Sequence, residues 1–465
     1  MSTTLETNEL KSIDELRQAV KGTVLTADDA GYDAARQVWN LAVEQHPAVI
    51  VIAQSAEDIA EAVGFANAND LDIAVKATGH GTIREANGSL LIVTAHMNDV
   101  QIDAAAQTAW ISAGTKWGRV LEQAQAVGLA PLLGSSPDVG AVGYTLGGGM
   151  GWLARHYGLS IDNVNYFEVV TAQGEIVTAS STENSDLFWA LRGGGGNFAV
   201  VTGMEVRLVP VKEVYAGNLY YPAELAPEVF ARFETWAANA PDELTSSVVL
   251  MNFPPIPEMP EFMRGQSFVM VRGCYSGRVE DGEALVKYWR DWQSPVVDDF
   301  KVMPFSQAAT ISNDPVDPTP GQSSGAWLKD LGAETAETLI HFVLPHGAPP
   351  KLVMAEVRHA GGQISKIDPG STAYGNRDAQ FSLQVVGFTP TPQSVLEVRE
   401  HIANMKQALE PHMHGGVYLN FLEGAEARQR TRQGFSAENF KCLQDIKAKY
   451  DPQNRFNHSY VFASK

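Results

Sequence analysis

Short apolar runs alternate with helical patterns along the first part of the chain. The runs "PAVIVIA", "LDIAVKA" and "SLLIVTA" have the length and β-branched content of buried strands. After the first run, apolar residues recur at helical spacing behind Ser55, which occupies an N-cap position. A second helix is predicted over "TKWGRVLEQAQAVGLA", ending at Gly128. This alternation predicts a domain in which strands are covered by helices.

Paired strands follow the helix that ends at Gly128. "NVNYFEVVTAQGEIVTA" predicts a hairpin around Gln173-Gly174, and "NFAVVTGMEVRLVPV" predicts a further pair of strands. After about residue 210, alternating strands such as "GQSFVMVRGCYSG" and "AQFSLQVVGFTP" occur between long helices. Two proline-rich loops, "FPPIPEMPEFMRG" and "SNDPVDPTPGQSSG", lie among them. We therefore predict a second α+β domain whose loops are mobile or face a substrate.

The composition is that of a globular protein. The chain has 465 residues, 45% of them hydrophobic, and this length favours two domains. It contains no stretch of about 18 consecutive apolar residues, and the acidic N-terminus lacks the pattern of a signal peptide. The formal net charge of −20 argues against binding to nucleic acid or anionic membranes. Cys274 and Cys442 fit neither a zinc site nor a disulfide framework, so we expect two buried free thiols in a cytoplasmic protein.

Three glycine clusters suggest a bound nucleotide. They are "ATGHG" (77–81), "GYTLGGGMG" (143–151) and "LRGGGGNFAVVT" (191–202). Glycine lets backbone N–H groups converge and lets a ligand approach the chain closely. No GxGxxG opens a helix with an acid about 20 residues later, and no GxxxxGK[ST] occurs. The clusters therefore predict a phosphate and a flat ring laid across the backbone, without a Rossmann motif or a P-loop.

His80 stands between two glycines in the first cluster. From the residues alone it fits a metal ligand, an acid–base residue, a covalent anchor or a structural histidine. A metal would need partners, and no second ligand lies at suitable spacing nearby. His412 and His414, in "EPHMHGG", are expected in an exposed loop rather than at a metal. No HExxH or GxSxG occurs, so zinc-protease and α/β-hydrolase chemistry has no support.

The segment "GGVYLNFLEGAE" carries Tyr418, Asn420 and Glu423. In an extended segment, Tyr418 and Asn420 would point to the same face. A tyrosine that acts as a base at pH 7 needs its pKa lowered by roughly 3 units, or about 4 kcal/mol. A nearby cofactor or cation would have to supply this free energy. Without one, the pattern favours a core tyrosine.

Four ordered segments resemble the berberine-bridge-enzyme-like flavoproteins of the vanillyl-alcohol-oxidase superfamily, above all their bacterial branch. They are "VKATGHG", "GSSPDVGAVGYTLGGGMGWLARHYGLSIDNV", "ENSDLFWALRGGGGNFAVVT" and "KYDPQNRF", and the resemblance spans nearly the whole chain. In that family the loop histidine is bonded through a ring nitrogen to the 8-methyl carbon of FAD, a role that falls to His80. Many members carry a second link from a cysteine, at whose position this chain has Ser136. The resemblance therefore implies FAD linked covalently through His80 only.

The resemblance also implies roles around the flavin ring. Ala141 stands where a larger residue gates dioxygen, so we expect open access and oxidase behaviour. Tyr418, in "YLNF", would act as base or orient the substrate, and Gln384 would be a polar contact from the substrate domain. In the closing "NRFNHSYVF", Ser459 and Val461 replace asparagines of the family pattern. The residues expected to bind FAD are Lys76, Ala77, Thr78, Gly79, His80, Gly81, Thr82, Gly134, Ser135, Ser136, Val139, Gly140, Gly143, Tyr144, Gly147, Gly148, Gly151, Val200, Val201 and Asn420.

The expected fold class is α+β, with a two-subdomain FAD-binding domain of the vanillyl-alcohol-oxidase type over residues 20–208. A substrate domain with an antiparallel sheet covered by helices would occupy 209–417, and residues 418–465 would return to the FAD-binding domain.

The implied activity is that of an FAD-dependent oxidase. It would remove hydride from a C–H next to OH or N of a small organic substrate, and dioxygen would reoxidise the flavin to give hydrogen peroxide. The alternatives are a dehydrogenase of the same fold, a flavin-holding protein without turnover, and an oxidative cyclase. The expected partners are a small-molecule substrate and dioxygen, with no metal, nucleic acid or membrane, in a cytoplasmic monomer or homodimer.

Overall fold

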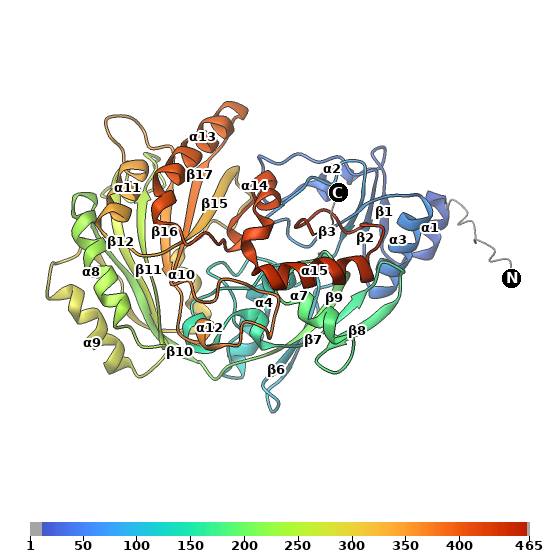
Figure 1. The fold of residues 1–465 in the computed structure, drawn as a ribbon, viewed down its shortest axis with the longest axis horizontal. Helices are drawn as coiled ribbons and strands as arrows, with labels where there is room; N and C mark the ends of the chain where they lie inside the picture. Colours follow the sequence, from blue (N-terminus) through green and yellow to red (C-terminus); the bar gives the residue numbers. More distant parts are fainter. Residues whose placement is uncertain (1–11, 463–465) are drawn as a thin grey trace.

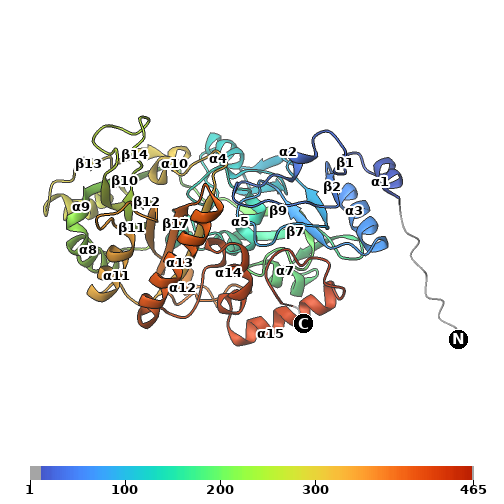
Figure 2. The ribbon, with the colours of Figure 1, turned by 90° about the horizontal axis from the view of Figure 1, so that it is seen from above.

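Three β-sheets follow one another along the chain in the computed structural model, which describes residues 12–462 (Figures 1 and 2). In the first sheet β2, β4 and β3 are parallel, and β1 is antiparallel to β2. Its strands, in spatial order, are β1 (Thr23–Leu25), β2 (Val49–Ile52), β4 (Leu90–Val93) and β3 (Ile73–Lys76). The helices beside it are α1 (Ile13–Ala19), α2 (Tyr32–Arg36) and α3 (Ala56–Ala68). The predicted N-cap is confirmed, because the Ser55 side chain accepts a hydrogen bond from the Asp58 N–H at the start of α3.

The second sheet has five strands, and all of its pairings are antiparallel. In spatial order they are β5 (Val100–Asp103), β6 (Thr108–Ser112), β9 (Val200–Arg207), β7 (Val164–Val170) and β8 (Ile176–Ser180). The accompanying helices are α4 (Trp117–Ala126), α5 (Ala141–Leu146), α6 (Ala154–Tyr157) and α7 (Ser185–Leu191). The hairpin predicted around Gln173-Gly174 is confirmed by the pairing of β7 with β8.

The pair of strands predicted over "NFAVVTGMEVRLVPV" is wrong, because this segment forms the single strand β9. The glycine inside it, Gly203, makes no turn. A Cβ at this position would overlap the indole of Trp110, which crosses the strand from β6. Gly203 is therefore explained by a close side-chain contact within a continuous strand.

The third sheet is antiparallel throughout and carries helices on one face (Figure 1). Its path is β13 (Val297–Asp298), β10 (Glu213–Pro222), β12 (Ser267–Tyr275), β11 (Leu244–Asn252), β16 (Met354–His359), β17 (Phe381–Phe388) and β15 (Gly321–Leu328), and β14 (Lys301–Pro304) also pairs with β10. The covering helices are α8 (Ala226–Ala238), α9 (Val279–Arg290), α11 (Ala333–Val343) and α13 (Pro392–Leu409), and α10 (Ala309–Ser312) and α12 (Gln363–Lys366) are short. The predicted α+β class and the helix-covered antiparallel sheet are thus confirmed.

The two faces of the third sheet differ in character. Alternate residues such as Val248, Leu250 and Val271 pack with the helices in one hydrophobic core. The residues between them, among them Ser247 and Arg272, lie on the opposite face and form a polar network described below. The face opposite the four covering helices, which we call the helix-free face, therefore carries the polar network, and the short α10 contacts it.

The C-terminal segment packs against the second sheet's helices, where α15 (Ala437–Tyr450) contacts α7 (Figure 2). Along the chain, α15 follows the short helix α14 (Gly424–Gln429). The buried Lys447 ammonium donates to the Asn197 carbonyl at 2.7 Å and pairs with Asp451 at 2.5 Å. Asp451 in turn accepts hydrogen bonds from the N–H groups of Arg455 and Phe456. In the motif "KYDPQNRF", Asp451 therefore stabilises the turn that follows α15.

The structure corrects one expectation about the cysteines. Cys274 is buried in β12, as expected, whereas Cys442 is exposed on α15. Burial raises the pKa of the Cys274 thiol far above its ordinary value. Across residues 12–462, no helix combines the length and apolarity needed to cross a membrane. Part of the N-terminal stretch for which we expect no signal peptide, residues 1–11, lies outside the described residues.

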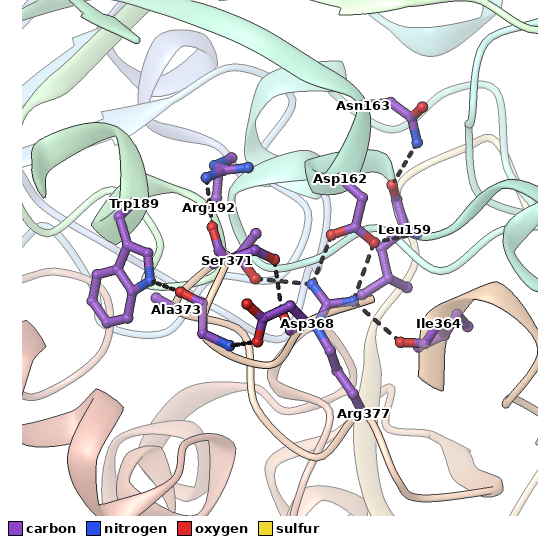
Figure 3. A network of polar contacts seen from close by, with 12 residues as sticks. Leu159, Asp162, Asn163, Trp189, Arg192, Ile364, Asp368, Ser371, Ala373 and Arg377 are labelled. Carbon is purple, nitrogen blue, oxygen red and sulfur yellow. Dashed lines mark hydrogen bonds and ion pairs between the residues drawn. The ribbon is translucent and has the colours of Figure 1, made fainter. Parts of the chain in front are cut away.

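A buried ion pair joins the short helix at Ser160–Asn163 to the loop before β17 (Figure 3). Arg377 donates to the two carboxylate oxygens of Asp162 at 2.6 and 3.2 Å and to the Thr372 hydroxyl at 2.9 Å. Both charged side chains are almost fully buried, with 2% and 5% of their surface exposed. The pair therefore connects the second sheet's domain to the third sheet without contact with water.

Replacing Arg377 with methionine should destabilise the protein strongly. The substitution leaves the Asp162 carboxylate buried without its counter-charge, which should lower the free energy of unfolding by about 3–5 kcal/mol in denaturant titrations. Arg278→Met is the matched control, because its pair with Asp281 is exposed and should contribute less than about 1 kcal/mol. Equal losses in the two variants would contradict the assignment.

Candidate functional site

The histidine loop begins where β3 ends at Lys76. The partly buried His80 ring stacks on Trp39, with 4.7 Å between ring centroids and 24° between planes. The Thr78 hydroxyl lies 2.8 Å from His80 Nδ1. Burial lowers the pKa of His80 to about 4, so the imidazole is neutral at pH 7. A neutral imidazole keeps one nitrogen with a free lone pair, as a nucleophile or a ligand requires.

Thr78 occupies one ring nitrogen of His80 and leaves Nε2 available. Within residues 12–462, the bond to Thr78 is the only hydrogen bond of this ring. Gly81 borders open space, since a Cβ built there meets no atom within 4 Å. The described residues contain no group of three or more His, Cys, Asp or Glu arranged to hold a metal ion. His80 thus combines a ring nitrogen without a hydrogen bond, among the described residues, with open space at the neighbouring Gly81.

The loop over residues 134–140 lies against the histidine loop. A Cβ at Gly140 would be 3.4 Å from Ala77 Cβ and 3.6 Å from the Thr78 hydroxyl. The buried Ser136 side chain accepts a hydrogen bond from the Asp138 N–H at 3.3 Å. Gly140 thus lies beside the residues that precede His80, and Ser136, four positions earlier on the same loop, carries a hydroxyl held by the Asp138 N–H.

The structure corrects the expectation of an open dioxygen path at Ala141. This residue is the first of α5 and has 0% of its surface exposed, because it packs in the hydrophobic core under the second sheet. A small side chain at this position therefore fills a core site rather than opening a passage.

Most glycines of the second cluster make room for the protein's own chain. A Cβ at Gly147 would overlap the Asn420 amide, and a Cβ at Gly151 would overlap the Leu133 carbonyl. Gly143 differs, because it is exposed and has open space around it. Most glycines of this cluster thus allow distant segments of the chain to meet, and Gly143 alone among those of the cluster borders open space.

Tyr418 lies where the C-terminal segment meets the second glycine cluster. Its oxygen accepts hydrogen bonds from the N–H groups of Gly149 at 3.1 Å and Met150 at 3.0 Å, and from the Asn420 amide at 3.1 Å. A neutral phenol oxygen has two lone pairs, so three donors favour the phenolate. Burial has the larger effect and raises the pKa of Tyr418 overall. Its oxygen is thus preorganised for negative charge, but needs further positive charge to ionise at neutral pH.

Tyr418 itself has an extended backbone, but the residues after it do not continue the extended segment that the sequence predicted. Leu419–Phe421 forms a 3₁₀ turn, and this turn brings the Asn420 amide back to the Tyr418 oxygen. The Phe421 ring lies 4.8 Å from the Tyr418 ring and perpendicular to it. Tyr418 and Asn420 therefore act together, as expected, but through a turn rather than a strand.

Glu423, the third polar residue of that segment, has a carboxyl that holds its proton near neutrality. Burial raises its pKa to about 7, against the opposing effect of hydrogen bonds from the Ser323 N–H and the Asn40 side chain. Ser323 lies on β15 and also receives a hydrogen bond from the Gln384 amide at 3.4 Å. Gln384, the polar contact expected from the substrate domain, is therefore on the helix-free face beside this carboxyl.

Replacing Glu423 with glutamine should remove a pH-dependent loss of stability. The unfolded carboxyl ionises near its ordinary pKa of 4.5, whereas the folded one keeps its proton up to about pH 7. The contribution of the protonated Glu423 to the free energy of unfolding is therefore fully present below about pH 4.5. It is lost as the pH rises to about 7, and the parent stays less stable above that pH. At pH 8 the variant should be up to about 3 kcal/mol more stable than the parent, with no difference at pH 4, in denaturant titrations.

Glu426→Gln is the control with the opposite sign. Burial alone would raise the pKa of Glu426, but Lys406 and Arg430 hold it below its usual value. Its substitution should therefore destabilise the protein at pH 8. A loss of stability at pH 8 in both variants would contradict the protonation assigned to Glu423.

The helix-free face of the third sheet presents a charged network to the same region. Glu356 on β16 accepts hydrogen bonds from Arg272, Arg358 and the Ser247 hydroxyl at 3.3, 2.8 and 2.7 Å. The Arg358 guanidinium lies 5.0 Å above the Phe421 ring, which in turn contacts Tyr418. Burial alone would raise the pKa of Glu356, but the two arginines lower it to about 2, so the carboxylate stays ionised. The second glycine cluster and the charged network around Glu356 thus lie on either side of Tyr418 and Phe421.

The residues expected to bind FAD fall into two groups. The histidine loop, the 134–140 loop and the start of α5 adjoin one another, with open glycines at 81 and 143. Lys76 instead directs its ammonium to the carbonyls of residues 35 and 37, both at 2.6 Å. The Val200 and Val201 side chains point into hydrophobic cores, so only their backbone is available.

The arrangement fits FAD on three counts. His80 Nε2 is unengaged, the neighbouring glycines leave space for close approach, and the buried Tyr144 hydroxyl has no hydrogen-bond partner among the described residues. A flavin ring with several acceptor atoms would satisfy such a hydroxyl. These features belong to one continuous region, and they therefore support the cofactor inferred from the sequence.

The sequence did not single out Trp39, Glu356 or Arg358. Trp39 contacts His80 although the two are 41 positions apart in the chain, and no local pattern connects them. Glu356 and Arg358 could have been found from the sequence, because they are two charged residues at alternate positions of the strand "MAEVRH". Such a pattern places both side chains on the same face of a strand and merits attention as a candidate site.

Known families match two parts of the chain that meet at this site. A model described as "FAD binding domain" matches residues 47–180, and one described as "Berberine and berberine like" matches residues 417–460. The first range holds the histidine loop and the second glycine cluster. The second range holds Tyr418, Asn420 and the closing motif.

Relatives and solved structures match nearly the whole chain. The uncharacterized FAD-linked oxidoreductase YgaK of Bacillus subtilis is 29% identical, over 94% of this chain and 95% of its own length. The (R)-6-hydroxynicotine oxidase of Paenarthrobacter nicotinovorans is 28% identical, over 95% and 96% of the two chains. The crystal structure of 6-hydroxy-D-nicotine oxidase from Arthrobacter nicotinovorans has a TM-score of 0.85 at 26% identity, and the match covers 98% of this chain and 100% of that one.

Proposed function

This chain is a berberine-bridge-enzyme-like FAD-linked oxidoreductase, and we propose that it is an oxidase for a small organic substrate. The reaction would remove hydride from a C–H next to OH or N and end in hydrogen peroxide. The observation that carries this proposal is the Tyr418 oxygen, held by three donors at the junction of the glycine cluster and the charged sheet face. The oxidase name of a relative matched over nearly its whole length supports dioxygen as the acceptor.

Residues of the first half of the chain would hold FAD. We assign the covalent bond to His80 Nε2, because Thr78 engages the other ring nitrogen. Ser136 has no thiol to form a second bond, so His80 would be the only covalent link. When bound, FAD supplies a hydride acceptor that dioxygen can reoxidise.

Tyr418 would take or polarise the proton of the substrate O–H or N–H. Gly149, Met150 and Asn420 hold its oxygen in place and stabilise the charge that develops there. The positive charge of Arg358 acts in the same direction on Tyr418. Gln384 would orient a polar group of the substrate from the facing sheet.

Peroxide formation tests the proposal directly. The purified holoprotein is given a panel of alcohols, sugars, amines and hydroxy acids in air, and hydrogen peroxide is measured alongside substrate loss. The proposal expects a member of the panel to give peroxide and product in equal amounts. Turnover that needs an added dye or quinone and yields no peroxide would instead make the protein a dehydrogenase of the same fold.

A further inference from the structure

Arg358 lies on the face of β16 that the helices leave free. Its strand neighbours are Ser247 on β11 and Ser382 on β17. The side chain is 13% exposed and extends over the Phe421 ring, toward Tyr418. Arg358 is therefore a cation placed within the region where the substrate would bind.

A single carboxylate is shared between two arginines at this place. Glu356 Oε2 accepts from Arg358 Nε, and Glu356 Oε1 accepts from Arg272 Nη1 and the Ser247 hydroxyl. The three ionised side chains thus leave one positive charge in excess. Asp314, on the loop before β15, offsets part of this charge by its proximity but makes no hydrogen bond to Arg358 within residues 12–462.

The two arginines differ in how many of their donors are used. Arg272 directs all three of its nitrogens to protein acceptors: the Asn218 side chain, Glu356 and the Ser312 carbonyl. Arg358 uses only Nε, and within residues 12–462 its two terminal amino groups have no hydrogen-bond partner. Guanidinium groups left open in this way bind carboxylates through two parallel hydrogen bonds. The excess charge and the free donors thus coincide on Arg358.

Apolar side chains continue the same face toward the end of the sheet. Val249 is paired with Glu356 across β11 and β16, and Met251 is paired with Met354 one step farther along. Val249 also packs with Phe268 and other apolar residues in a separate small cluster. A ligand held by Arg358 would therefore have an apolar wall beside it.

We propose that the terminal amino groups of Arg358 bind the carboxylate of the substrate, which makes the substrate class an organic acid with an apolar body. This inference rests on the proposed function, because it names the substrate class of that site. It is independent of turnover, since a carboxylate can bind to the oxidised holoenzyme without being oxidised. A hydroxy acid or amino acid with an apolar side chain combines the carboxylate with the C–H that the reaction needs.

The test is the binding of a matched pair of probes, phenylacetate and phenylacetamide, to the oxidised holoenzyme. Binding is followed by the change in the flavin absorbance spectrum and confirmed by calorimetry. We expect phenylacetate to bind more tightly than the amide, by on the order of tenfold or more. Arg358→Gln should abolish this difference, and Arg358→Lys should retain part of it.

Arg272→Gln is the control, because it removes the excess charge of the network and leaves the free donors of Arg358 in place. Since the two parallel hydrogen bonds can still form, it should keep a reduced preference for phenylacetate. Equal affinities of the parent for both probes, no binding of phenylacetate, or a preference that survives in Arg358→Gln would each overturn the proposal. If Arg272→Gln fails to fold, the graded series of Arg, Lys and Gln at position 358 decides alone. Peroxide formation is measured separately, so failure of the oxidase proposal is distinguishable from failure of carboxylate binding.

Discussion

Replacing His80 with alanine is expected to leave no flavin attached to the protein after denaturation in acid. The parent should keep its yellow colour in the precipitate and show the mass of one bound FAD. His80 combines a neutral ring, an unengaged Nε2 and open space at Gly81. Ser136, at the position of a second link, has no thiol. We therefore expect no second covalent link to FAD in the variant, and all of its flavin should pass into the supernatant.

Two further variants make the His80 result specific. Ser136→Ala should keep the covalent flavin, because the hydroxyl only accepts a hydrogen bond from the neighbouring Asp138 N–H. His46→Ala changes an exposed histidine, with 60% of its side chain accessible, and should keep it as well. Covalent flavin in His80→Ala would show that another residue forms the bond. Its loss in Ser136→Ala would show a role for the hydroxyl that the structure does not suggest.

The glycine clusters show how far the sequence alone could lead. The clusters marked a region where the backbone is closely approached, because such an approach favours glycine. They did not reveal what approaches. At Gly147 and Gly151 the neighbour is the chain itself, from residues 420 and 133, and such long-range contacts leave no pattern in the local sequence.

The charged network was beyond local patterns for a similar reason. Glu356 is 84 positions from Arg272 and 109 positions from Ser247, and the three meet only because β12, β11 and β16 are neighbours in the sheet. The strand order of an antiparallel sheet is not encoded within any one strand. By contrast, the strand and helix patterns of β17, α3 and α4 predicted the corresponding elements, because side-chain periodicity is a local property.

Ala141 illustrates a different limit. The small size of Ala141 predicted open access for dioxygen, because the family has a larger residue at this position. In the structure Ala141 is the first residue of α5. Whether a small residue opens a path depends on what surrounds it, and here the second sheet's core surrounds it completely. Side-chain volume predicts access only when the neighbours are known.

Replacing Tyr418 with phenylalanine should slow flavin reduction by about 10²- to 10⁴-fold while changing substrate affinity much less. The substitution leaves the donors of Gly149, Met150 and Asn420 without their shared acceptor and removes the oxygen that receives the proton. Anaerobic stopped-flow mixing with a substrate found by the peroxide panel separates the rate of reduction from the dissociation constant. Because burial raises the pKa of Tyr418, reduction in the parent should become faster as pH rises, and the variant should lose this dependence.

Tyr374→Phe supplies the matched control for this experiment. The Tyr374 ring lies 6.2 Å from the Tyr418 ring, and its buried hydroxyl has no hydrogen-bond partner within residues 12–462. The same atom is removed from the same neighbourhood, but the three converging donors stay with Tyr418. Tyr374→Phe should therefore reduce its flavin at nearly the parental rate. Equal rates in the two variants would exclude Tyr418 as the proton acceptor and would make its three hydrogen bonds a structural connection between the C-terminal segment and the glycine cluster.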